Sequence, residues 1–272
     1  MCKSFRYTAS AVAMLISTTL SAQRPFKFQE KSSITIRPAS TAAEQLKQAA
    51  HVWRMMSIAS DAEKRRRGYS EAMINLDLVA KLWPSDTAAV LEAATMQADL
   101  SMEVGQPANA IAALQPYSEW AASTPLYPGV QRRLAEAYVA IGNDTEAENH
   151  FLLAERSIQK SRVGRIEAEA VLGAIAHFYA DHGNPHESMK RYDSLAKLPD
   201  QTTVNKVTFA LGKLKQAVEL KDDQDLKNAK GAFADLEDSV IDARGKSLKP
   251  EEAATIEAAY RDAQDIRRKR HF

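Results

Sequence analysis

Apolar side chains recur at steps of three and four residues along most of the chain. The first clear case follows Thr41, where Leu46, Ala49, Trp53 and Met56 fall on one face of a helix. The alternation typical of a β-strand is hinted at only in residues 33–36. The pattern therefore predicts an all-α protein. Further helices are predicted at residues 69–83, 85–103, 107–117, 128–141, 144–159, 164–181, 185–197, 203–221, 224–242 and 250–269.

Three glycines mark short turns between these predicted helices. Gly105, Gly142 and Gly183 follow one another at intervals of 37 and 41 residues. A Gly just beyond a helix adopts the left-handed conformation that closes the helix end. The Asn or Pro residues that come next favour the start of a new helix. Helix-turn-helix units repeated at this interval predict an α-solenoid, in which each pair packs against its neighbours.

The stretch from Leu134 to Ala154 resembles a tetratricopeptide repeat. A second unit, with Tyr179, Gly183 and Tyr192 in equivalent places, departs mildly from the pattern, and weaker units extend the resemblance over roughly residues 43–240. The resemblance implies a right-handed superhelix of about five antiparallel helix pairs plus a C-terminal capping helix. The residues that carry the best unit are Ala135, Tyr138, Gly142, Ala147, Phe151 and Ala154.

In that family the first helix of each pair lines a concave groove that binds extended peptides or partner helices. Helical phase then selects seven inward-facing candidates, although an ordinary solvated helix surface would carry the same residue types. Arg132 and Glu136 are four positions apart, so they share a face and are able to pair. The expected groove alternates in charge and suits a polar peptide. The candidates are Asp99, Met102, Arg132, Glu136, Val139, His177 and Asp181.

Residues 1–22 have the layout of a secretory signal peptide. Lys3 and Arg6 precede an apolar run in residues 11–20, and small residues follow at the expected cleavage point. Cleavage after Ser21 or after Ala22 fits this layout. The run is shorter than the ~20 residues that span a bilayer, so no stable membrane span is expected after cleavage. The alternative is an uncleaved, N-terminally membrane-anchored protein.

The expected organisation is a tether at 23–40, helical repeats at 41–247 and a capping helix with a basic end at 248–272. The single cysteine, Cys2, lies inside the predicted signal. The mature chain would therefore contain no disulfide, thiolate zinc site or cysteine nucleophile. A periplasmic or secreted location is expected.

Charge gives no indication of a nucleic-acid partner. The chain has 36 Lys and Arg against 35 Asp and Glu, so it has no domain-wide basic field. Two basic clusters stand out, at residues 64–67 and 267–270. The first precedes Gly68 and is expected just before a helix, whereas the second suits the negative end of the last helix dipole. Contact with an anionic surface is the alternative for both.

Candidate chemistry is sparse. His177, His182 and His186 fall within ten residues, but the turn at Gly183 separates them, so no metal site is expected. We find no nucleophile elbow, phosphate loop or dinucleotide fingerprint, and expect no cofactor and no enzymatic activity. The aromatic loop at 117–128 would either rim a peptide groove or be held closed by its own aromatic side chains.

The expected function is a non-catalytic scaffold that binds another protein or a peptide. The alternatives are an accessory or catalytic solenoid of cell-wall metabolism and a membrane-anchored adaptor.

Overall fold

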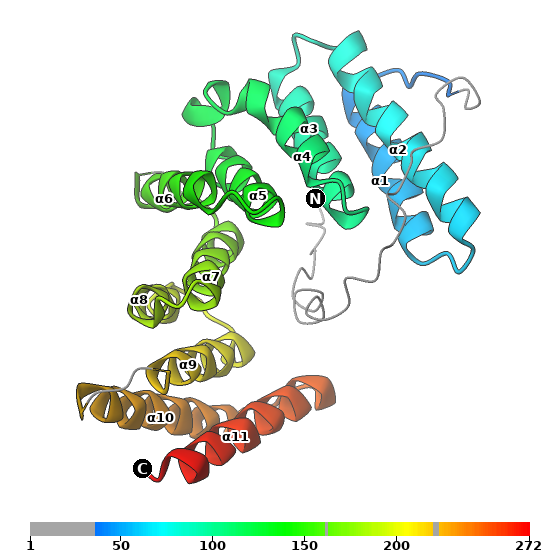
Figure 1. Cartoon of the computed structure of the whole chain (residues 1–272). Helices are drawn as coiled ribbons and strands as arrows, with labels where there is room; N and C mark the ends of the chain where they lie inside the picture. Colours follow the sequence, from blue (N-terminus) through cyan, green and yellow to red (C-terminus); the bar gives the residue numbers. More distant parts are fainter. Residues whose placement is uncertain (1–35, 161–162, 220–222) are drawn as a thin grey trace.

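The computed structural model describes residues 36–160, 163–219 and 223–272. Over these residues the chain forms eleven α-helices, two short 3-10 helices and no strand (Figure 1). The prediction of an all-α protein is confirmed. The predicted signal peptide and most of the predicted tether, residues 1–35, lie outside the described residues.

The helices form five consecutive pairs and a final single helix. Each pair packs together and contacts the pair that follows, which is the arrangement of an α-solenoid. The short 3-10 helices η2 (Gln115–Tyr117) and η3 (Trp120–Ser123) join the second pair to the third. The α-helices are α1 (Ala42–Ser57), α2 (Ala62–Leu82), α3 (Thr87–Glu103), α4 (Pro107–Leu114), α5 (Tyr127–Ala140), α6 (Asp144–Lys160), α7 (Arg165–Asp181), α8 (Pro185–Ala196), α9 (Thr203–Ala217), α10 (Asp223–Arg244) and α11 (Pro250–Arg270).

The stack of pairs is curved. Figure 1 shows α6 and α8 on its outer side, at the left of the view, and α5 and α7 on its inner side, with α9, α10 and α11 below them. Helix α3 contacts α5, and α5 contacts α7, so the first helices of the second, third and fourth pairs lie side by side. We call this row of first helices the inner surface.

The three glycine turns close in the same way. Gly105, Gly142 and Gly183 have φ values of 71°, 76° and 68°, in the left-handed region. The residue after each glycine donates its backbone N–H to a carbonyl five positions earlier, so each helix ends in a Schellman motif. The prediction of helix-closing glycines is confirmed. The bonds are Gln106 N to Ser101 O at 2.8 Å, Asn143 N to Tyr138 O at 2.9 Å and Asn184 N to Tyr179 O at 2.8 Å.

These turns allow a paired test of backbone conformation. An alanine at Gly142 must hold a left-handed conformation, so Gly142→Ala is expected to lower the free energy of unfolding by about 1–2 kcal/mol. Gly173 lies inside α7, and a Cβ built there has no neighbouring heavy atom within 4 Å. Gly173→Ala is therefore expected to raise the free energy of unfolding by about 0.5–1 kcal/mol. Urea denaturation measures both, and shifts of the same sign would contradict the assignment.

Small and aromatic side chains from the best repeat fill the space between helices. Ala135, Ala147 and Ala154 are completely buried, which lets the helix backbones approach closely. Phe151 is 2% exposed, and its ring centroid lies 5.2 Å from that of Phe178 on α7. The aromatic therefore joins the third pair to the fourth.

Three further aromatics of the repeat pattern are buried or half-buried between helices. Tyr138 is half-buried and stacks on His150 with ring centroids 5.2 Å apart. Tyr192 on α8 is buried and packs directly on Gly212 of α9, where a Cβ would lie 2.5 Å from the ring. Tyr179 is buried as well. The repeat-defining residues thus lie at or near the contacts between successive helices.

The predicted start of the second helix at residue 69 is wrong. Helix α2 begins at Ala62, where the Asp61 carboxylate accepts the Lys64 backbone N–H at 2.7 Å. The basic cluster at 64–67 therefore belongs to the helix and does not precede it. Gly68 is a packing residue, since a Cβ there would lie 1.8 Å from the Met56 Cγ of α1. Gly68 is needed because α1 and α2 approach closely at this point, and it does not end or interrupt the helix.

Candidate functional site

Asp99, on α3, is bound by the neighbouring first helix. Arg133 of α5 donates to Asp99 from Nε to Oδ1 at 2.6 Å and from Nη2 to Oδ2 at 3.0 Å. A two-pronged contact of this kind fixes both side chains and neutralises the carboxylate. Asp99 therefore holds α3 to α5.

Arg132 is largely enclosed, with its side chain only 15% exposed. Its Nη1 donates to Glu136 Oε1 at 2.6 Å, and its Nε lies 3.6 Å from Glu167 Oε1 on α7. Burial lowers the pKa of Arg132, but the two carboxylates outweigh burial and raise that pKa. The expected pairing with Glu136 is confirmed. The expectation that Arg132 faces a partner needs correction, because this guanidinium links α5 to α7.

The other four predicted groove residues differ in accessibility. Met102 is half-buried and packs on the core beneath α3, α4 and α5. Val139 is 36% exposed at the end of α5, and His177 and Asp181 are exposed one turn apart on α7. The ring of His177 lies edge-on to Tyr192 at 6.3 Å between centroids. The inner surface therefore offers Val139, His177 and Asp181 to solvent, while Asp99, Arg132 and Glu136 are occupied within the fold.

The same kind of ion pairing occurs between second helices. Arg191 of α8 donates from Nη2 to Glu155 Oε2 of α6 at 2.8 Å, and it also pairs with Glu187. Its guanidinium lies 4.9 Å from the centroid of the Tyr179 ring. In three such ion pairs the two residues are 34 to 36 positions apart in the sequence, which is about one repeat. These pairs are Asp99–Arg133, Arg132–Glu167 and Glu155–Arg191. Opposite charges at the repeat interval are the sequence signal that could have identified these contacts.

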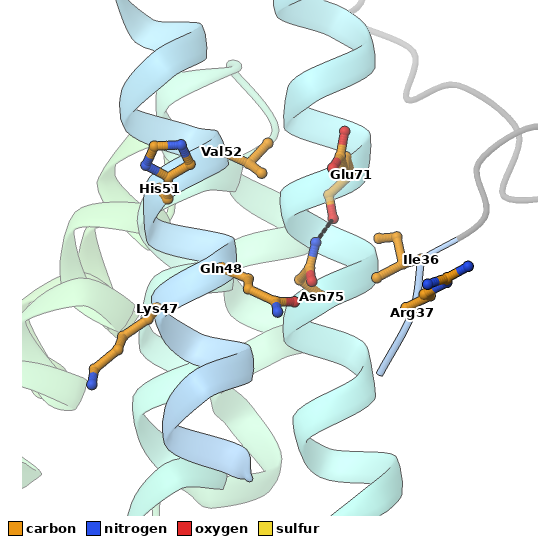
Figure 2. Close-up of a pocket in the computed structure, with 8 residues that line it drawn as sticks. All are labelled: Ile36, Arg37, Lys47, Gln48, His51, Val52, Glu71 and Asn75. Atoms are coloured by element: carbon orange, nitrogen blue, oxygen red, sulfur yellow. Dashed lines mark hydrogen bonds between the residues drawn. The ribbon is translucent and has the colours of Figure 1, made fainter. Parts of the chain in front are cut away.

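A cavity of about 470 Å³ lies between α1, α2 and the residues that precede α1. Figure 2 shows side chains from the neighbouring helices α1 and α2 and, beside α2, from the N-terminal segment, with Lys47 and Arg37 extending to opposite sides. Sequence reasoning missed this site because its residues come from three separate stretches. The lining residues are Ile36, Arg37, Lys47, Gln48, His51, Val52, Glu71 and Asn75.

A buried amide network joins α1 to α2 beside this cavity and includes its lining residue Asn75. Gln45 is completely buried and donates from Nε2 to Asn75 Oδ1. Asn75 Nδ2 donates to the Glu71 carbonyl at 2.8 Å, and the Ala39 N–H donates to Gln45 Oε1 at 2.8 Å. The end of the predicted tether is therefore attached to α1 and is no longer a free spacer.

The three clustered histidines do not converge. The described part of the chain contains no group of three or more His, Cys, Asp or Glu residues placed to hold a metal ion. His182 instead joins two turns, with Nδ1 2.7 Å from the Phe178 carbonyl and Nε2 3.1 Å from Asp144 Oδ1. The hydrogen bond to Phe178, followed by that to Asp144, raises the pKa of His182 above its ordinary value near 6.5.

The raised pKa gives the His182 contact a predictable pH dependence. Stabilisation by the protonated ring is complete below the ordinary pKa and declines as pH rises through the raised value. Asp144 and Asp181 are the charged groups that favour the protonated ring. We expect wild type to exceed His182→Gln in urea midpoint at about pH 5.5, with a smaller difference at about pH 8.5. An equal difference at both pH values would contradict this role of the ring.

The aromatic loop before α5 packs largely on itself and the core. The Tyr117 and Trp120 rings lie 6.1 Å apart, and Tyr117 and Tyr127 contact the core cluster that contains Ala121. Trp120 remains 40% exposed. This arrangement favours the loop held closed by its own aromatics.

No helix among the described residues is long and apolar enough to cross a membrane.

Comparison with known proteins gives information on the fold and none on the function. No family model matches the chain, and no curated protein sequence matches it. The chain is similar in structure to BtubC (BKLC) from P. vanneervenii, with 12% sequence identity and a TM-score of 0.53, over 79% of this chain and 96% of that chain. The likeness at this identity shows that the two proteins share a helical architecture.

Proposed function

We propose that this protein is a non-catalytic binding scaffold, whose inner surface holds a peptide or a partner protein. The observation that carries the proposal is the row of first helices along one side of a curved stack. A solenoid buries each pair only against its neighbours, so it leaves a long continuous surface for recognition. Val139, His177 and Asp181 are the predicted groove residues that remain accessible there.

The proposal includes membership of the tetratricopeptide repeat family. The shared Schellman closure at Gly105, Gly142 and Gly183 supports it, as does the burial of Phe151 and Tyr192 between helices. These features match the positions on which the sequence resemblance rests.

We also propose that the protein acts outside the cytoplasm, on the basis of residues 1–22. The mature chain is expected to begin at Ala22 or Gln23. Mass spectrometry of the native protein tests this. An intact Met1 on cytosolic protein would contradict export, and an intact N-terminus in the membrane fraction would favour the anchored adaptor.

Site-specific crosslinking tests the binding surface. A photoreactive phenylalanine at Val139 or His177 is expected to capture one defined partner in the native envelope. The same group at Ser194, exposed on α8, is the matched control. Asp181→Lys is expected to abolish capture from His177 while circular dichroism stays unchanged, because Asp181 is exposed. Equal capture from Ser194, or none from either inner position, would contradict the proposal.

A further inference from the structure

We propose that the α1–α2 cavity is a second binding site, which takes an acidic segment of an extended peptide. The cavity belongs to the first helix pair, whereas the accessible inner-surface residues lie on α5 and α7. Binding at the two places is therefore separable.

Two cations at the edge of the cavity have no acidic partner among the residues that the structure describes. Among the described residues, Arg37 and Lys47 have no carboxylate within ion-pair distance, and neither has His51. Arg37, Lys47 and His51 are exposed, whereas the enclosed cations Arg132 and Arg191 are paired with acids from neighbouring helices. Exposed cations at the two edges of a concave site attract carboxylates and form charge-assisted hydrogen bonds with them.

The remaining lining groups select a peptide over a phosphate polymer. Glu71 places a carboxylate on the α2 wall, where it repels phosphate but accepts N–H groups. Gln48 on the α1 wall adds an amide that donates to carbonyls, and Ile36 and Val52 add apolar surface. An extended peptide supplies N–H groups, carbonyls and side chains together, whereas a polyphosphate supplies only acceptors.

The cavity is formed before any ligand arrives. Gln45 and Asn75 are both buried and join α1 to α2, and the Ala39 N–H fixes the N-terminal segment to the same network. A prearranged site avoids the entropy cost of ordering its walls on binding. Its volume of about 470 Å³ is that of a site for a few residues.

The test uses the mature full-length chain and a fluorescein-labelled octapeptide of alternating Asp and Gly. The control peptide has Asn in place of Asp. Fluorescence anisotropy is expected to show binding of the acidic peptide only. Reversal of two cavity charges, Arg37→Glu with Lys47→Glu, is expected to weaken binding at least about tenfold. The matched control, Lys64→Glu with Arg67→Glu, alters net charge equally on exposed α2 residues outside the cavity lining and should change binding less than about threefold.

A second measurement on the unaltered protein does not depend on any variant folding. Histidine ring signals in NMR are expected to shift for His51 and not for His177 when the acidic peptide is added. Inorganic tripolyphosphate should bind wild type weakly and bind Glu71→Gln more tightly. Equal weakening by both charge reversals, no peptide binding, tripolyphosphate binding as tight as the peptide, or a shift of His177 alone would each overturn the proposal. None of these results would alter crosslinking from Val139, so failure here is distinct from failure of the inner-surface proposal.

Discussion

Phe151→Ala is expected to lower the free energy of unfolding by about 3–5 kcal/mol, because the truncated ring leaves a cavity that its neighbours fill only in part. Phe151 is 2% exposed and contacts Phe178 across the boundary between the third and fourth helix pairs. Urea denaturation followed by circular dichroism measures the change. Leu153→Ala, on the same helix and 36% exposed, is the control and should cost less than about 1 kcal/mol.

The same substitution should act locally before it acts globally. In a solenoid each pair contacts only its neighbours, so a weakened boundary loosens the centre first. Amide hydrogen exchange is expected to accelerate in α5, α6, α7 and α8 more than in α1 and α2. A loss below about 1 kcal/mol, or uniform acceleration along the whole chain, would show that Phe151 does not join these pairs.

Arg191→Ala is expected to cost about 3–5 kcal/mol, since removing one partner of a buried ion pair leaves the other charge uncompensated. The Arg191 side chain is 10% exposed and that of Glu155 is 17% exposed. The neighbouring Lys190 also pairs with Glu187, but its side chain is 67% exposed. Lys190→Ala should therefore cost only about 0–1 kcal/mol.

A double-mutant cycle separates the ion pair from the packing of the long Arg191 side chain. Glu155→Gln is combined with Arg191→Ala, and the coupling energy between the two changes is measured by urea denaturation. We expect a coupling well above the experimental error. Additive changes would mean that Arg191 acts through its stacking on Tyr179 and not through Glu155.

Features that depend on neighbours along the chain were predictable from sequence. The apolar period of α3, α7 and α8 and the turns at Gly142 and Gly183 follow from interactions within a few residues. Local contacts also explain why these predicted boundaries agree with the structure to within two residues. The export signal, the repeat family and the binding function are inferences from sequence that still await the experiments above.

Features that depend on which helices meet were not predictable from local pattern. Glycine is typical of helix ends, yet Gly68 lies inside α2 and its role depends on contact with Met56 of α1. Whether a charged side chain forms an ion pair is likewise decided by residues on other helices.

The chain by itself determined an all-α repeat protein, because helix period and glycine closure are encoded within one turn of backbone. Only the tertiary structure decided that Arg132 is enclosed by Glu136 and Glu167, while Arg37 and Lys47 meet no carboxylate of the described residues beside the α1–α2 cavity. Helical phase gives the direction of a side chain, but the partner it meets about 35 residues away depends on how successive pairs stack. Stacking is set by close packing of whole surfaces, which no short stretch of sequence specifies.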